Sequence, residues 1–121
     1  QPAYHAQGNH GRYEARVLAT KMLELENRPT AIFAASDTQA MGVVEAARDL
    51  GLSVPGDLSI IGYDDIEVAE YLGLTTIRQM LYESGQRGVE LLINTIESKP
   101  KQPVCEVMPT ELIVRQTTAK L

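Results

Sequence analysis

Polar side chains follow three apolar segments of the sequence, at positions where a parallel sheet would meet a ligand. Asp37 follows "TAIFAAS", Asp64 ends "LSIIGYD", and Gln79 ends "TTIRQ". Because ligands of open parallel sheets bind outside the carboxyl ends of the strands, we expect these side chains to share one crevice. Carboxylates accept hydrogen bonds from vicinal hydroxyls or ring N–H groups, so the predicted ligand is a neutral polyol, sugar or nucleobase.

Each of these side chains also has a structural explanation. Asp65 is expected to cap the short helix that follows it, because aspartate is a favoured N-cap residue. Asp37 fits the first turn of its own helix equally well, and Gln79 fits a solvated strand end. A ligand is favoured for Asp64, because a carboxylate beside a buried Gly-Tyr pair would cost stability without a partner.

Other site chemistries are disfavoured by the sequence. Asp64, Asp65 and Glu67 lack the further oxygen ligands of a calcium loop, so we expect no metal site. A Gly-rich phosphate loop is missing, and Ser36 has no plausible histidine base nearby. A phospho-acceptor aspartate, as in response-regulator receivers, would need a lysine at a later strand end, and "TTIRQ" offers none. The sequence therefore predicts neither an enzyme nor a cofactor.

Composition limits the classes of partner. The 121 residues are 44% hydrophobic and carry a formal net charge of −5, without a run of basic residues. We expect one domain or part of one, which does not itself bind nucleic acid. One cysteine, Cys105, excludes an internal disulfide, and no stretch approaches the roughly 20 apolar residues of a membrane span. The prediction is a cytoplasmic protein without membrane contact, in which residues 1–11 are a linker or a cut end.

The elements that must position these side chains alternate between helix and strand. Apolar spacing predicts a first helix over about 12–26, and the capping-box pair Ser36 and Gln39 begins a second helix that Gly51 ends. The strands on either side of this second helix are apolar on both faces, which is typical of a parallel sheet between two helical layers. Residues 31–64 should therefore form a βαβ unit.

The remaining pattern completes a three-layer α/β lobe. A short helix is expected around 66–71, followed by the strand "TTIRQ" and a long amphipathic helix over about 82–96. The segments "VCEVMP" and "TELIVRQT" are expected to be edge strands, interrupted by Pro109.

The order and spacing of several motifs add a family resemblance. The stretch "RPTAIFAASDTQAMGVVEAARDLGLSVPGDLSIIGYDDIEVAEYLGLTTIRQ", followed by "PTELIVRQTT", resembles the C-terminal part of the effector-binding core of LacI/GalR (lactose/galactose repressor) family regulators. The resemblance covers roughly residues 28–118. It implies a periplasmic-binding-protein-like type I fold, in which two lobes close on a small effector. The family's effector-contacting positions match Ser36 or Asp37, then Asp64 and Gln79.

The resemblance also implies partners and further sites. Residues 12–121 would be the C-terminal lobe, with 82–97 a helix that packs on the other lobe, and operator DNA would bind to an N-terminal headpiece outside this chain. The parent protein would be a homodimer and would bind a small-molecule effector, with a sugar as the expected class. The residues expected at the dimer contact are Met41, Val44, Tyr71 and Leu72.

Three points stay open at this stage. The family takes a pocket aromatic from just before the first helix, where Tyr4, His10 and Tyr13 are all candidates. A secreted sugar-binding protein of a transport system is an alternative to the regulator. The effector, the operator and the choice between repression and activation cannot be read from these residues.

Overall fold

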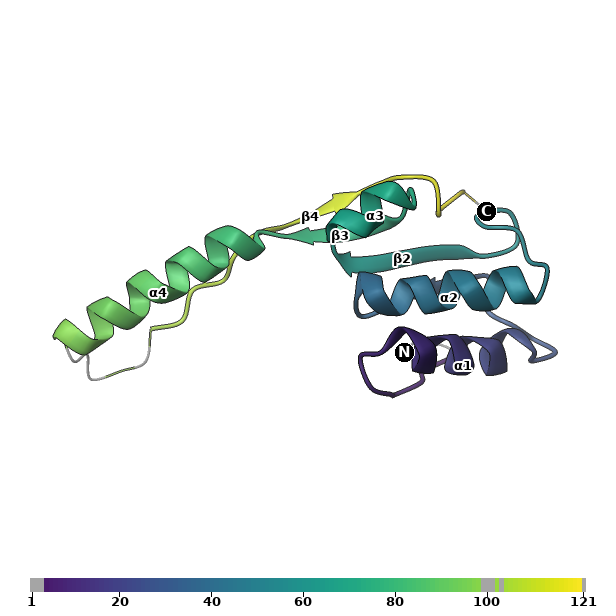
Figure 1. Cartoon of the computed structure of the whole chain (residues 1–121), viewed down its shortest axis with the longest axis horizontal. Helices are drawn as coiled ribbons and strands as arrows, with labels where there is room; N and C mark the ends of the chain where they lie inside the picture. Colours follow the sequence, from purple (N-terminus) through teal and green to yellow (C-terminus); the bar gives the residue numbers. More distant parts are fainter. Residues whose placement is uncertain (1–3, 99–101, 103, 121) are drawn as a thin grey trace.

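The chain forms a lobe from which one long helix projects (Figure 1). The computed structural model describes residues 4–98, 102 and 104–120. Its elements, in chain order, are α1 (Arg12–Leu23), β1 (Ala31–Phe33), α2 (Asp37–Asp49), β2 (Ser59–Asp64), α3 (Glu67–Tyr71), β3 (Thr75–Gln79), α4 (Leu81–Ser98) and β4 (Thr110–Ile113). We call α1 to α3 with the four strands the lobe, and α4 with the returning segment 104–109 the arm.

The sheet has the order β1-β2-β3-β4. The first three strands are parallel, with Ile32 opposite Ile60 and Gly62 opposite Thr76. This arrangement confirms the predicted βαβ unit. The last strand, β4, pairs antiparallel with β3 at the edge of the sheet, as predicted for "TELIVRQT". The prediction of a strand at "VCEVMP" is wrong, because residues 104–109 have no strand structure.

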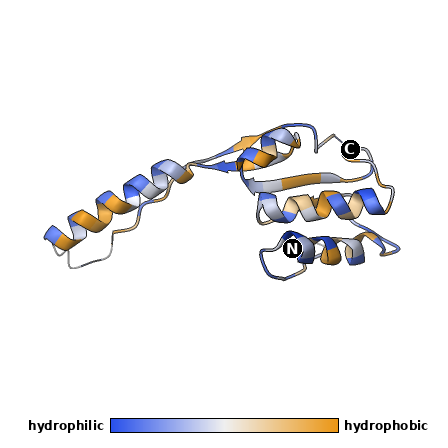
Figure 2. Ribbon diagram, viewed as in Figure 1, coloured by the Kyte–Doolittle hydropathy of each residue, from blue (hydrophilic) through white to orange (hydrophobic). Residues whose placement is uncertain are grey.

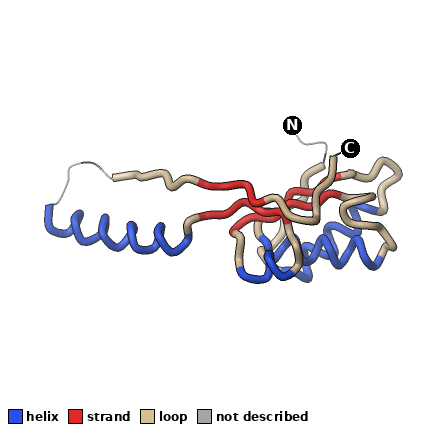
Figure 3. The backbone as a smooth tube through the Cα atoms, turned by 90° about the horizontal axis from the view of Figure 1, so that it is seen from above, coloured by secondary structure: helices blue, strands red, loops and turns tan. Residues whose placement is uncertain are grey.

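The helices of the lobe lie on one side of the sheet (Figure 3). Leu58 and Ile60 are fully buried on that side. Phe33 is 61% exposed, so the prediction that β1 is buried on both faces is wrong. The reason is that β1 is an edge strand whose second face is not covered by any described helix. The described lobe therefore has two layers, and a third layer is not supplied by these residues.

The pair α1 and α2 packs closely because α2 carries a glycine at the contact. A Cβ atom at Gly42 would lie 2.2 Å from the carbonyl oxygen of Arg12. The predicted first helix is confirmed; Ala19 and Leu23 are its buried residues, whereas Tyr13 is 75% exposed. The absence of a side chain at Gly42 allows this close approach.

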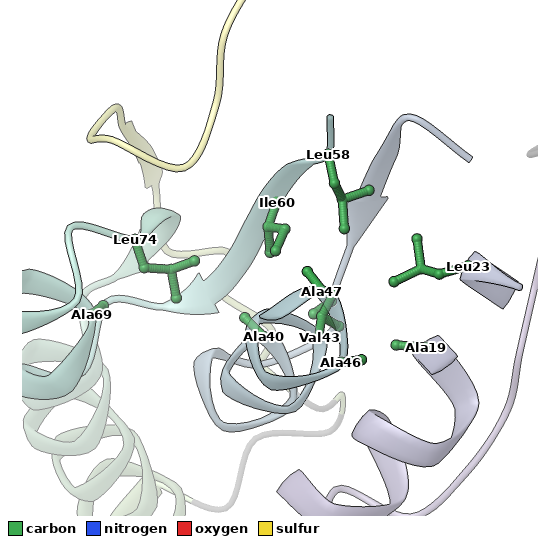
Figure 4. Packing of buried hydrophobic residues seen from close by; sticks show 11 residues of the cluster. Ala19, Leu23, Ala40, Val43, Ala46, Ala47, Leu58, Ile60, Ala69 and Leu74 are labelled. Carbon is green, nitrogen blue, oxygen red and sulfur yellow. The ribbon is translucent and has the colours of Figure 1, made fainter. Parts of the chain in front are cut away.

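The core of the lobe lies between the sheet and α2 (Figure 4). Leu58, Ile60 and Leu74 come from the strands or the turns before them, and Val43 and Ala47 meet them from α2. Each large aliphatic side chain buried in this way stabilises the fold by about 1.5–3 kcal/mol. This core fixes the carboxyl ends of β2 and β3 relative to the start of α2.

The helix predicted over 82–96 is confirmed as α4, and none of its residues is buried. Apolar and polar residues alternate along it in the pattern of an amphipathic helix (Figure 2). It is joined to the lobe by β3 before it and by the returning segment and β4 after it (Figure 1). The arm therefore begins where the predicted site residues lie.

Candidate ligand-binding site

Asp37 does not face a crevice. Its side chain is fully buried; Oδ1 accepts a hydrogen bond from the Thr76 hydroxyl (2.6 Å), and Oδ2 accepts one from the Ile66 backbone N–H (2.9 Å). A Cβ atom at residue 62 would lie 2.2 Å from Oδ1, so glycine at this position makes room for the carboxylate. The expectation that Asp37 contacts a ligand is therefore corrected: both of its oxygens are used to join α2, β3 and the start of α3.

Ser36 is the N-cap of α2, as the capping-box spacing predicted. Its Oγ accepts a hydrogen bond from the backbone N–H of Gln39 (3.2 Å). The Gln39 side chain does not return to Ser36; it donates to the carbonyl oxygen of Asn9 (3.2 Å). The half-buried Ser36 hydroxyl can still donate a hydrogen bond to a ligand.

Asp64 and Gln79 come together at the carboxyl ends of β2 and β3. The amide Nε2 of Gln79 donates a hydrogen bond to Oδ1 of Asp64, and both side chains are half-buried. The backbone of Asp64 has φ of +114°, a conformation that L-residues rarely adopt. The second carboxylate oxygen of Asp64 is left to accept hydrogen bonds from a ligand.

Asp65 is held by two arginines and caps no helix. Its Oδ2 lies 2.7 Å from Nε of Arg78 on β3, and its Oδ1 lies 2.7 Å from Nη2 of Arg115, two residues after β4. The predicted cap is wrong, because the N-cap of α3 is Ile66 and the backbone N–H of that residue binds Asp37. Partial burial raises the pKa of the Asp65 carboxyl, but hydrogen bonds and charge from Arg115 and Arg78 outweigh it, and the pKa is lowered.

Sequence reasoning did not single out Arg78 and Arg115. The available signal was a basic residue inside an otherwise uncharged strand, "TTIRQ", and another next to the edge strand in "LIVRQT". A charged residue that close to a buried segment needs a partner, and the second aspartate of "GYDD" was available.

A groove of about 320 Å³ adjoins the Asp64–Gln79 pair at the root of the arm. Tyr63 and Gln79 line it from the lobe and Thr110 from β4, with Met80 between β3 and α4, whereas Ser84 and residues 106–109 line it from the arm. The Tyr63 ring also packs edge-on against Phe33, with centroids 6.4 Å apart. Gln79 lines this groove together with the Tyr63 ring, and an aromatic wall beside an amide suits a ring-shaped polar ligand.

The three candidate aromatics before α2 differ in position. The Tyr4 hydroxyl donates to the carbonyl oxygen of Asn27, in the loop that leads into the amino end of β1. The bond from Gln39 to Asn9 places the segment before α1 at the start of α2, and His10 follows Asn9 directly. His10 is exposed, and Tyr13 is 75% exposed.

Within residues 4–98, 102 and 104–120, no group of three or more His, Cys, Asp or Glu side chains is arranged to hold a metal ion. None of the described helices combines the length and the apolar character that crossing a membrane requires.

Comparisons with known proteins point to one family. Residues 2–118 match the periplasmic binding protein-like domain. The HTH-type transcriptional repressor PurR of Vibrio parahaemolyticus is 38% identical over 117 residues, which is 95% of this chain and 35% of PurR. The chain thus spans about a third of that relative, whose name describes a transcription repressor and not an enzyme.

Solved structures agree with this match. The lac repressor dimer bound to operator and the anti-inducer ONPF superposes with a TM-score of 0.90 at 31% identity, over 99% of this chain and 42% of that one. A LacI family transcriptional regulator from Enterococcus faecium with bound ribose gives a TM-score of 0.81 at 33% identity, over 92% of this chain and 41% of that one.

Proposed function

Because the chain belongs to the periplasmic binding protein-like domain family and corresponds to part of the effector-binding core of LacI/GalR regulators, we propose that it binds a small polar effector that controls a DNA-binding transcription regulator. The effector binds beside Asp64, Gln79 and Ser36, and Asp64 is its main anchor on this lobe. The regulator is a cytoplasmic repressor, and operator DNA binds to its N-terminal headpiece. The match to repressors favours this proposal over a secreted sugar-binding protein.

The observation that carries the proposal is the Asp64–Gln79 pair at the ends of two parallel strands. Asp64 presents an acceptor oxygen, and Gln79 supplies an amide that can both donate and accept. The groove lined by Tyr63 adjoins this pair. Vicinal hydroxyls of a sugar match these groups, and the ribose in the structure from Enterococcus faecium supports that class of ligand.

Regulation follows from the position of the arm. The two strands that frame α4 carry Gln79 at the end of β3 and Thr110 at the start of β4. Residues 82–97 pack on the other lobe of the regulator, so an effector held between the lobes favours their closed arrangement. Effector binding changes operator affinity to the extent that the effector prefers one arrangement over the other.

The regulator acts as a homodimer through a patch of Met41, Val44, Tyr71 and Leu72. Tyr71 is 88% exposed and Leu72 38% exposed, which makes them the accessible part of the patch. Val44 packs partly against the core, so it contributes less surface. Sedimentation of the full-length double variant Met41→Glu, Leu72→Glu tests the patch: dissociation supports it, and an intact dimer contradicts it.

Calorimetry on the full-length protein tests the effector site, with ribose and hypoxanthine as the probes. Replacing Asp64 with Asn removes a charged acceptor, so affinity for the bound probe should fall by about 1.5–3 kcal/mol. Asp57→Asn is the matched control, because Asp57 binds Ser53 in a loop at the other end of β2. Unchanged affinity in Asp64→Asn would refute Asp64 as the anchor.

A further inference from the structure

We propose that Asp65 is a positioning residue: it locks the two strands that carry the arm and holds the neighbouring Asp64 in its binding orientation. The inference deepens the proposed function and rests on it for the role of Asp64. It identifies the second aspartate of "GYDD" as the link between the effector site and the root of α4.

Two arginines from different parts of the chain contact Asp65. Arg78 belongs to β3, which leads into α4, and Arg115 follows β4, which returns from the arm. Both bind one carboxylate, at 2.7 Å each, and the Asp65 side chain is only 7% exposed. A single carboxylate therefore joins β3 to the segment that follows β4.

Arg115 has further contacts that fix it in the lobe. Its Nη1 donates to the carbonyl oxygen of Leu74 (2.9 Å), and its backbone N–H donates to the Thr75 hydroxyl (2.9 Å). The arginine is thus anchored at the opposite end of β3 from Gln79. Arg115 is therefore fixed to the start of β3, and Asp65 connects it by ion pairs to Arg78 near the end of the same strand.

The backbone has an unusual conformation at both aspartates. Asp64 has φ of +114° and Asp65 φ of +56°, two consecutive non-glycine residues with positive φ. Such conformations are strained and persist where the surroundings enforce them. Here the arginines hold the Asp65 side chain, and Asp37 holds the backbone N–H of Ile66, the next residue. Contacts of the Asp65 side chain and of the Ile66 backbone thus hold this turn, and in it the Asp64 side chain faces Gln79.

Both aspartates contact side chains at the end of β3. Asp64 binds Gln79 and Asp65 binds Arg78, so consecutive aspartates hold consecutive residues of β3. A ligand that donates hydrogen bonds to Asp64 competes with the Gln79 amide for this carboxylate, whereas the Asp65 contacts stay in place. The competition is then felt at Gln79 and Met80, the residues directly before α4.

Hydrogen exchange and NMR on the 121-residue chain test the inference without a ligand. Asp65→Asn keeps the shape of the side chain and tolerates positive φ, but removes the charge. We expect amide exchange in 75–79 and 110–113 to accelerate by about tenfold, while exchange in α1 and α2 stays unchanged. The side-chain amide signal of Gln79 should also shift, because its acceptor is no longer held.

Asp49→Asn is the matched control, since it breaks another aspartate–arginine pair, with Arg16, away from the arm. Should Asp65→Asn fail to fold, Arg115→Met takes its place and should accelerate exchange chiefly in 110–113. Equal acceleration in all elements would overturn the inference, because Asp65 would then only add global stability. Wild-type exchange in both strands, or an unmoved Gln79 signal, would overturn it as well.

These outcomes are distinct from a failure of the proposed function. If Asp65→Asn behaves as expected but Asp64→Asn binds ribose or hypoxanthine as tightly as the wild type does, only the effector site is refuted. If calorimetry supports Asp64 but exchange is unaltered in Asp65→Asn, only the positioning role is refuted.

Discussion

The lobe buries its apolar side chains, whereas the arm exposes them. Leu58 and Ile60 are fully buried, but Leu92 is 60% exposed and Ile96 is 64% exposed. Both α2 and α4 have an apolar face, and that of α2 is covered by the sheet and α1. The contrast shows that an amphipathic pattern predicts a helix and the need for a cover, but not which chain supplies the cover.

The arm is also held by weaker interactions than the lobe. Arg87 on α4 binds Glu106 of the returning segment at 2.6 Å and Glu90 at 2.9 Å, and all three side chains are 38% exposed or more. Ion pairs at that exposure contribute about 0–1 kcal/mol each. The lobe instead has Asp37 and Asp65, whose partners come from several elements.

The largest effect is expected for self-association of the 121-residue chain. The uncovered face of α4 should pair with a second copy, since burying Leu92 in both copies of a symmetric dimer contributes about 3–6 kcal/mol. Leu92→Lys should therefore give a monomer in sedimentation velocity over a concentration series. The Met41→Glu, Leu72→Glu variant is the control that separates this contact from the patch on the lobe. A wild-type chain that stays monomeric at high concentration would contradict the prediction.

Gly42 in the lobe and Gly88 in the arm differ in how closely they are packed. At Gly42 a Cβ atom would meet the backbone of α1, so Gly42→Ala should lower the free energy of unfolding by about 1–3 kcal/mol through overpacking. At Gly88 on α4 the same atom would meet nothing within 4 Å, so Gly88→Ala should stabilise the helix by about 0.5–1 kcal/mol. Urea unfolding followed by circular dichroism measures both. Equal effects would mean that the two helices are packed alike.

Much of the fold could be predicted because its signals are local. Ser36 and Gln39 mark the start of α2, and the apolar runs before Asp37 and Asp64 mark two strands of the parallel unit. The exposure of Phe33 could not be predicted in the same way. Its strand has the composition of a buried one, and only the tertiary arrangement reveals that the described helices cover a single face.

The site residues show the same division between local and distant causes. Asp37 and Asp64 both follow apolar strands, yet Asp37 is buried because Gly62 and Thr76 make a space and a partner for it. Asp65 looks like a helix cap next to "IEVAEY", but Arg78 and Arg115 reach it from other strands. Sequence proximity favoured the cap, and tertiary charge pairing decided the outcome.

The smallest effect concerns acid pH and again separates the lobe from the arm. The pKa of Asp65 is lowered in the folded chain, so its ion pairs stabilise the fold above the ordinary value of 3.8 and are lost as pH falls through the lower folded value. Unfolding free energies of wild type and Asp65→Asn should therefore differ at neutral pH and converge only in this acid range.

Arg78 and Arg115 are the charged partners of Asp65, and Arg78 in turn lies near Glu111 and Glu70. In the arm, the Arg87 side chain likewise lowers the pKa of Glu106. That pair is exposed, so Glu106→Gln should leave global unfolding unchanged at every pH and alter only the exchange of α4. Urea titrations at a series of pH values measure both variants. Curves for wild type and Asp65→Asn that stay parallel into strong acid would show that the Asp65 pairs do not contribute to the stability of the lobe.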